Sequence, residues 1–350
     1  MDEKQRVKDA IKFNETDKIP WQINYTNGIA RKVMEDHKLK ENKNLILGKN
    51  VSAYNNLDNY FGNHIKTIAA RALDSSREIK KNLWEDEWGV IWDRSVDKDI
   101  GIPINYPLKD QGLNDLKIPD PDQDERYLHF DPIIEEHSNR YILARLTYNI
   151  FERAWSLRGM ENLMMDFVQN PSLVHELFGI ICDFFKRIIP NLGNFKVDGL
   201  LFGDDWGGQN GLLINPNMWR EFIKPYISDM YDLAHSHNFD VFIHSCGDIS
   251  AILEDLVETG VDVFNPLQPE VMYVGETMKK YSKRLAFYGS LSLQKTLPFG
   301  TPEQVIGEIE NRLELASIYK GLIISPSHSM TPDIPVENID AMVNRLKENI

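Results

Sequence analysis

The stretch IHSCGD (243–248) places His244 and Cys246 two positions apart, in a chain that has only two cysteines. The preceding run, Asp240 to Ile243, is typical of a buried strand. Because strand residues i and i+2 project from the same face, both side chains are expected to point the same way. Imidazole nitrogen and thiolate sulfur are ligands that zinc prefers. The pair is therefore either part of a metal site or a coincidence of packing.

Further polar residues follow other predicted strands. His328 comes directly after the last strand, and it could complete a catalytic zinc site of three protein ligands and one open position. Asp204 and Asp205, in GDDWGG, could hold a proton, receive substrate or orient a histidine ligand. The alternative is that strand ends are polar simply because loops face water. Substrate-binding residues are expected at the same ends, namely Asn24, Tyr25, Thr147, Trp206, Gln268 and Tyr288.

These residues require strands whose carboxyl ends meet. Short apolar runs alternate with amphipathic segments of about 12–20 residues, and continuous apolar runs favour a parallel sheet that is buried on both faces. We expect an α/β protein, a (β/α)8 TIM barrel forming a single domain over residues 1–350, with an N-terminal helical extension. An eighth strand is expected near 60–100. A doubly wound sheet is the alternative, but no glycine-rich loop follows the first run. The seven runs are 19–25, 140–147, 198–205, 240–247, 262–269, 284–290 and 321–327.

An irregular region near 84–135 is expected to be strands and turns inserted on the barrel. It begins with WEDEWGVIW (84–92), which contains Trp88. On an inserted hairpin, Trp88 and its neighbours could form a lid over an aromatic substrate. The alternative is that they form the small core of the insert.

Composition narrows the function classes. A formal net charge of −14 argues against nucleic-acid binding, and no apolar run is long enough to cross a membrane. The charged N-terminus lacks a signal-peptide pattern, and the low cysteine content indicates a reducing compartment, so a cytoplasmic protein is expected. Cys182, in LFGIICDFF, is interpreted as a buried packing residue. The oligomeric state is left open, with a homodimer among the options.

Three segments carry a resemblance to a known family. RVKDAIKFNETDKIPW, FGDDWGGQNGLLINPNMWREFIKPY and SPSHSMTPDIPVENIDAMV resemble the N-terminal, Asp-Ser-Trp-Ala-Gly and closing segments of the uroporphyrinogen decarboxylase superfamily. The resemblance implies a (β/α)8 barrel. True decarboxylases of this superfamily carry arginines after the first strand that grip the substrate's carboxylates. Here that stretch is NYTNGIARKVMED, with only Arg31 nearby, and the barrel mouth is expected to be acidic, which argues against porphyrinogen decarboxylation.

The other branch of the superfamily contains zinc methyltransferases that work with corrinoid proteins, such as the methylcobamide:coenzyme M methyltransferases. HSCG matches the first part of their His-x-Cys zinc motif, whereas His328 stands where they have a later cysteine. One thiolate and two neutral imidazoles would leave zinc more electrophilic, which suits an ether oxygen as leaving group. This motivates a hypothesis of O-demethylation, in which a small methylated substrate, favoured to be an aryl methyl ether, gives its methyl group to a corrinoid (cobalamin) protein.

Two other functions stay open at this point. One is a metal-free decarboxylase or related lyase, in which His328 and an aspartate would handle protons. The other is a non-catalytic binder of a tetrapyrrole or corrinoid.

Overall fold

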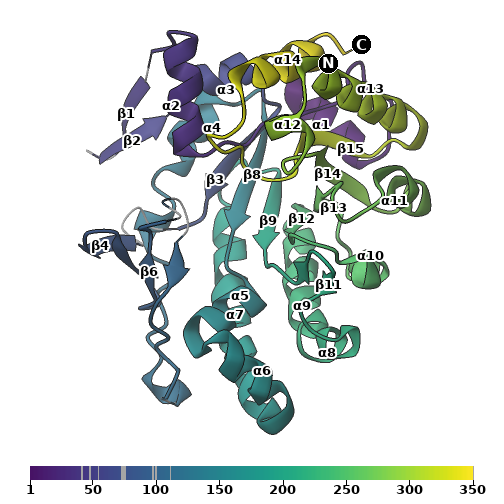
Figure 1. The fold of residues 1–350 in the computed structure, drawn as a ribbon. Helices are drawn as coiled ribbons and strands as arrows, with labels where there is room; N and C mark the ends of the chain where they lie inside the picture. The colour runs from purple at the N-terminus through teal and green to yellow at the C-terminus, as the bar shows by residue number, and fades with distance from the viewer. Residues whose placement is uncertain are drawn as a thin grey trace.

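The centre of the molecule is a sheet of seven parallel strands. The computed structural model describes residues 1–40, 42–46, 49–53, 55–71, 76–96, 98, 101–110 and 112–349. In these, the strand order is β15-β14-β13-β12-β9-β8-β3 (Figure 1). The strands are β3 (Ile65–Ala69), β8 (Tyr141–Leu146), β9 (Gly199–Gly203), β12 (Asp240–His244), β13 (Val263–Leu267), β14 (Ala286–Leu291) and β15 (Leu322–Pro326). The six downstream runs expected from the sequence all form strands here.

An extended segment near Trp21 closes the curled sheet into a barrel. Trp21 forms a parallel bridge with Ile324 of β15, and the amide of Ile324 donates to the carbonyl of Pro20 at 2.9 Å. On the other side, the amide of His64, just before β3, donates to the carbonyl of Trp21 at 3.1 Å. The first predicted run is thus a bridged extended segment, and β3 is the strand expected near 60–100. The (β/α)8 barrel prediction is confirmed.

Helices follow most of the strands and cover the outer face of the barrel (Figure 1). The amphipathic segment at 218–237 forms two helices divided at Ile223, because Pro225 lacks the N–H needed to continue the first one. The helices are α1 (Glu3–Ile11), α2 (Asn27–Asp36), α3 (Asn55–Phe61), α4 (Phe130–Glu136), α5 (Ile150–Arg158), α6 (Met160–Gln169), α7 (Pro171–Leu192), α8 (Pro216–Phe222), α9 (Lys224–Ser236), α10 (Leu253–Glu258), α11 (Val274–Tyr281), α12 (Thr296–Phe299), α13 (Pro302–Tyr319) and α14 (Val336–Lys347). Among the described residues, none of these helices combines the length and the apolar character that a membrane span requires.

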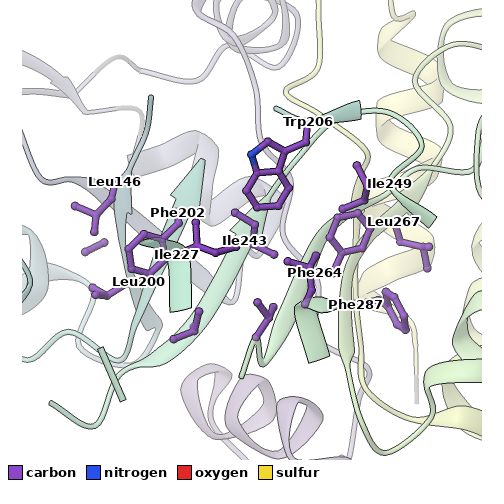
Figure 2. Packing of buried hydrophobic residues seen from close by; sticks show 14 of the residues in the cluster. Leu146, Leu200, Phe202, Trp206, Ile227, Ile243, Ile249, Phe264, Leu267 and Phe287 are labelled. Atoms are coloured by element: carbon purple, nitrogen blue, oxygen red, sulfur yellow. The ribbon is translucent and has the colours of Figure 1, made fainter. Parts of the chain in front are cut away.

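Alternation along the strands divides the core into two parts. Phe202, Ile243 and Phe264 point outward and pack against the helices in one large cluster, part of which Figure 2 shows. Their neighbours Leu201 and Phe242 point inward and form a second cluster inside the barrel. Both faces of the sheet are buried, as the continuous apolar runs indicate.

Helix α1 closes the amino-terminal end of the barrel. Val7 and Ile11 belong to the inner cluster, so one face of α1 packs under the strands. Lys4 and Lys8 each form an ion pair at 2.9 Å with Asp198, which precedes β9. The predicted N-terminal extension is therefore a plug, and access to the interior is from the carboxyl ends of the strands.

The insert is a four-stranded antiparallel sheet beside the barrel (Figure 1). It starts earlier than the sequence suggests, since its first strand begins at Ser76. Residues 97, 99, 100 and 111 of the predicted insert lie outside the described residues. Its strands are β4 (Ser76–Lys80), β5 (Leu83–Asp86), β6 (Ile91–Asp93) and β7 (Ile102–Pro103). Among the described residues, two further antiparallel pairs join β1 (Asn42–Ile46) to β2 (Lys49–Ala53) and β10 (Gly207–Gly208) to β11 (Gly211–Leu212).

Candidate functional site

His244, Cys246 and His328 converge at the carboxyl end of the barrel. One potential ligand atom from each lies within 4.8 Å of the others. His244 ends β12 and shares its inward-facing side with Phe242 of the inner cluster. Its Nε2 is 3.4 Å from the Cys246 Sγ, and its ring centroid is 5.7 Å from that of His328. Three potential ligands, separated by up to 84 positions, therefore face one point.

A neighbouring amide sets the tautomer of His244. The Nδ2 of Asn265 donates to the backbone carbonyl of Tyr288 at 3.0 Å, which leaves the Asn265 Oδ1 free to accept. His244 Nδ1 lies 2.6 Å from that oxygen and donates to it. Nδ1 then carries the proton, and the Nε2 lone pair points toward Cys246. Metal-binding histidines are usually oriented in this way by a partner on the other ring nitrogen.

The donor set fits a zinc ion. With Zn–S near 2.3 Å and Zn–N near 2.0 Å, tetrahedral angles put sulfur and nitrogen about 3.5 Å apart. The separation of 3.4 Å between His244 Nε2 and Cys246 Sγ matches this spacing. Burial raises the pKa of the Cys246 thiol, and the charges of Asp205 and Glu152 raise it further. A cation beside the sulfur would act in the opposite direction and favour the thiolate.

Asp205 holds the loop that carries Cys246. Its Oδ1 accepts the amide proton of Cys246 at 2.8 Å and lies 3.8 Å from His244 Nε2. Gln268 supports the next residue, since its Oε1 accepts from the Gly247 amide at 3.1 Å. The carboxylate of Asp205 is thus beside the potential metal ligands, whereas Gln268, which is buried, positions the loop and does not line an open site.

Two glycines allow the Cys246 loop to lie directly on the loop after β9. A Cβ on Gly207 would be 2.6 Å from the carbonyl oxygen of Cys246, closer than such atoms ever approach. A Cβ on Gly247, whose φ is +84°, would be 2.4 Å from the carbonyl carbon of Gly207. At Gly207 and Gly247 the absence of a side chain thus allows two backbone segments to approach each other closely.

His328 stands on a loop that is anchored on both sides. Before it, the Ser327 amide donates to the carbonyl of Leu291 at 3.0 Å. After it, the Met330 amide donates to the carbonyl of Asn24 at 2.9 Å. The His328 side chain is exposed, unlike the partly buried His244 and Cys246, so it forms the outer side of the cluster.

The structure corrects the roles expected for Asp204 and Trp206. Asp204 is fully buried, and its carboxylate accepts the amide protons of Phe151 at 3.0 Å and Glu152 at 2.7 Å, in the first turn of α5. The same carboxylate accepts the Trp206 indole N–H at 2.8 Å. Trp206 is fully buried in the outer core (Figure 2). Adjacent strand-end residues point in opposite directions, so Asp205 faces the cluster while Asp204 caps a helix.

Three other predicted residues take different positions. The Tyr25 hydroxyl donates to Asp58 of α3 at 2.8 Å and so is engaged on the outer side. Asn24 Nδ2 donates to the Tyr288 hydroxyl at 2.9 Å. Tyr288 belongs to the buried inner cluster, and burial raises the pKa of its hydroxyl to about 12. Asn24 and Tyr288 therefore lie inside the barrel and support its mouth, and Tyr25 does not point toward the metal ligands.

A cleft between the insert and the barrel brings Trp88 and Thr147 together. It encloses about 710 Å³, part of which is open to solvent. Trp88 packs edge-on against Phe184 of α7, with ring centroids 5.0 Å apart. Trp92 lies across from Tyr148 at 5.1 Å. Trp88 and Trp92 of WEDEWGVIW thus pack between insert and barrel and also line the cleft.

The charge of this cleft contradicts the expectation of an acidic barrel mouth. Five arginines line it, against two carboxylates, Asp86 and Glu87. Sequence reasoning missed these arginines because they come from separate segments. One signal was available: Arg145 interrupts the apolar run of β8, at a position with the inward parity of Leu143. The five are Arg71, Arg94, Arg126, Arg145 and Arg153.

Glu152 is a further residue that the sequence did not reveal. It lies in the first turn of α5, and burial together with the charges of Asp205 and Asp204 raises its pKa well above the usual range. Its charge also raises the pKa values of Cys246 and Tyr148. Glu152 therefore interacts electrostatically both with a candidate metal ligand, Cys246, and with Tyr148, which lines the arginine-rich cleft.

Comparisons with known proteins identify one family and two kinds of enzyme relatives. A sequence model of the family described as Uroporphyrinogen decarboxylase (URO-D) matches residues 103–349. The uroporphyrinogen decarboxylase of Pelodictyon phaeoclathratiforme is 24% identical over 267 residues, 71% of this chain and 72% of that protein. The methylated-thiol–coenzyme M methyltransferase of Methanosarcina mazei is 25% identical over 198 residues, which are 57% of this chain and 51% of that protein.

A solved structure shows the same fold over the whole chain. It is described as a methyltransferase from Methanosarcina mazei, and it superimposes with a TM-score of 0.76 at 18% identity, covering 99% of both chains. The sequence relatives are thus enzymes of two kinds, decarboxylases and methyltransferases.

Proposed function

The chain belongs to the uroporphyrinogen decarboxylase (URO-D) family, and from this premise we propose that it is a zinc-dependent methyltransferase that passes a methyl group from a small substrate to a corrinoid protein. The observation that carries the proposal is the convergence of His244, Cys246 and His328 within 4.8 Å. The likeness to a methylated-thiol–coenzyme M methyltransferase supports it. A metal-free decarboxylase has no evident use for a partly buried thiol beside two imidazoles.

The favoured substrate is an aryl methyl ether. Zinc bound by two imidazoles and one thiolate supplies Lewis acidity to a leaving oxygen. A reduced corrinoid on the partner protein would supply the electron pair that the methyl group accepts. The oxygen keeps the pair of the broken C–O bond and takes one proton from solvent.

The residues of this chain have distinct roles in the proposal. His244, Cys246 and His328 are the ligands, with Asn265 fixing the tautomer of His244 through the 2.6 Å contact. Asp205 fixes the Cys246 loop. Because the ligands stand at the carboxyl ends of the strands, a substrate enters from the open end of the barrel, opposite the α1 plug.

A second candidate is a decarboxylase that acts on a carboxylated substrate. The arginine-lined cleft favours it, since guanidinium groups bind carboxylates with two parallel hydrogen bonds. Such a decarboxylase needs neither the Cys246 thiol nor a bound metal ion, so the metal content of the purified protein distinguishes the two functions.

The first test is metal analysis of protein purified without chelators. We expect about one zinc per chain, and strong loss of zinc in His244→Ala, Cys246→Ala and His328→Ala. Cys182→Ala and His237→Ala are matched controls, because Cys182 is buried in α7 and His237 lies on the far side, after α9. Replacing zinc by Co(II) should give a thiolate-to-metal absorption band that Cys246→Ala removes.

The second test is turnover. Methoxybenzenes and a reduced corrinoid protein should give the absorbance of methyl-cobalt only when the zinc-loaded chain is present. Far less than one zinc per chain, unchanged by the ligand variants, would exclude the methyltransferase and favour the decarboxylase. If the chain binds zinc but transfers no methyl group from any ether, thiol or amine, the remaining explanation is a binding protein without catalytic activity.

A further inference from the structure

Five guanidinium groups line the cleft between the insert and the barrel. Arg126 forms an ion pair with Glu87, and Arg153 pairs with Asp86 at 2.7 Å. Within the described part of the chain, neither Arg71 nor Arg145 makes an ion pair with a carboxylate. The cleft therefore keeps a surplus of positive charge, in a protein whose formal net charge is −14.

Arg145 is unusual for a strand residue. The residues before it on β8 are buried, as is Leu146 after it, yet the Arg145 side chain is reached by solvent. Desolvation by the surrounding protein atoms nevertheless lowers the pKa of its guanidinium, and the charge of Arg71 lowers it further. An anion between the two arginines would relieve both the desolvation and the repulsion.

The cleft and the metal ligands are on the same side of the barrel. Thr147, which lines the cleft, has its Cγ2 3.4 Å from where a Cβ on Gly203 would be, and Gly203 pairs in register with His244. Neighbouring strands are about 4.8 Å apart, so two strand steps correspond to about 10 Å. This separation between the ends of β8 and β12 is similar to the length of a benzene ring that carries a polar group at each end.

The distribution of charge gives the bound molecule a direction. The Asp205 carboxylate accepts from the Cys246 amide at 2.8 Å, whereas Arg71 and Arg145 line the cleft. Trp92 and Tyr148, with ring centroids 5.1 Å apart, line the same cleft as these arginines, where an aromatic ring can pack. An anionic group is repelled by the Asp205 carboxylate and attracted by the two guanidinium groups.

We propose that the substrate is an aromatic methyl ether that carries a carboxylate, held by Arg145 and Arg71, with its methoxy group directed toward His244, Cys246 and His328. This inference rests on the proposed function for the reaction, but the carboxylate site itself does not. The arginine side of the cleft selects the acid, and the opposite side contains the atom to be demethylated.

The first experiment measures binding without turnover, by titrating tryptophan fluorescence or by calorimetry. The probes are 4-methoxybenzoate and its neutral isostere 4-methoxybenzamide. We expect wild type to bind the acid at least about tenfold more tightly than the amide. Arg145→Gln and Arg71→Gln should each remove most of this preference and leave amide binding unchanged, which also verifies that the variants fold. Arg145→Lys should retain part of the preference.

A matched control is Arg77→Gln, the same change on the exposed surface of the inserted sheet. It should bind both probes as wild type does. Cys246→Ala should keep its preference for the acid, because the carboxylate site does not include the metal ligands. Equal binding of acid and amide by wild type, or an Arg145→Gln variant that still prefers the acid, would overturn the inference.

The second experiment compares methyl transfer from the two probes. Transfer from the acid, with kcat/KM reduced about tenfold or more in Arg145→Gln, supports both the inference and the proposed function. Preferential binding of the acid without any transfer would support the carboxylate site and overturn the methyltransferase. Equal transfer from neutral and carboxylated ethers would support the methyltransferase and overturn the substrate class.

Discussion

The carboxylate of Asp205 accepts the backbone N–H of Cys246 at 2.8 Å, so a residue after β9 determines where a thiol after β12 is placed. The two strands are neighbours and their residues pair in parallel register up to Gly203 and His244. The contact ties the loops that follow them together. It also places a negative charge 3.8 Å from His244 Nε2.

Removing this carboxylate should weaken metal binding. Asp205→Ala is expected to reduce zinc affinity about 10- to 100-fold, the range for partners that orient metal ligands. Asp205→Asn keeps an oxygen that can accept the amide proton of Cys246, so its zinc affinity should fall less than that of Asp205→Ala. Competition with a chromophoric chelator measures both, with the exposed Asp232→Asn as control. An Asp205→Ala variant with wild-type affinity would refute this role.

Gly247 should tolerate no side chain. Gly247→Ala puts a Cβ 2.4 Å from the backbone of Gly207 and imposes a φ of +84° on alanine, so the Cys246 loop has to move. We expect a loss of about 1–3 kcal/mol in the free energy of unfolding together with weakened zinc binding. Urea denaturation and chelator competition are the measurements.

The control for this change is Gly179→Ala, in the middle of α7. No atom lies within 4 Å of the added Cβ there. A helical glycine costs conformational entropy, so this substitution should stabilise the protein by about 0.5–1 kcal/mol. A stable Gly247→Ala variant with intact zinc affinity would mean that the two loops can separate freely.

Asp204 should matter for stability and not for ligand binding. Asp204→Ala removes the acceptor for two amide protons of α5 and for the Trp206 indole, of which the Phe151 amide and the indole are buried. Leaving these donors without a partner is expected to cost about 2–4 kcal/mol. The zinc content of the folded fraction should stay at the wild-type level. Loss of zinc without loss of stability would contradict the helix-capping role.

His64 should make the protein less stable in acid. Burial lowers its pKa from 6.5 to about 3, so below pH 6.5 the unfolded chain binds a proton that the folded chain does not. This cost grows as the pH falls, by about 1.4 kcal/mol per pH unit. When the pH falls from 7.5 to 5.5, the free energy of unfolding of His64→Phe should therefore increase by about 1 kcal/mol relative to that of wild type. Urea denaturation at the two pH values measures this difference.

His235 provides a control of opposite sign. Its hydrogen bond to Asp262 raises its pKa, so its contribution is present in acid and is lost as the pH rises through the folded-state pKa. His235→Gln should lose stability relative to wild type on going from pH 7.5 to 5.5. Parallel pH profiles for wild type and both variants would refute the assignment.

The sequence alone determined the fold and the identity of the three potential metal ligands. Apolar runs that are buried on both faces have few solutions other than a parallel sheet covered by helices, and β8, β9 and β12 to β15 form where these runs occur. Strand parity also indicated that His244 and Cys246 lie together. Local chemistry and periodicity are enough for such statements.

Only the tertiary structure decided which neighbouring residue serves the site. Asp204 and Asp205 are adjacent and chemically identical, but one caps α5 inside the core and the other holds Cys246. The cleft likewise joins Arg71 and Arg145, which are far apart in the chain. Whether a charged side chain meets a partner depends on how segments distant in sequence are packed, and no local pattern contains that information.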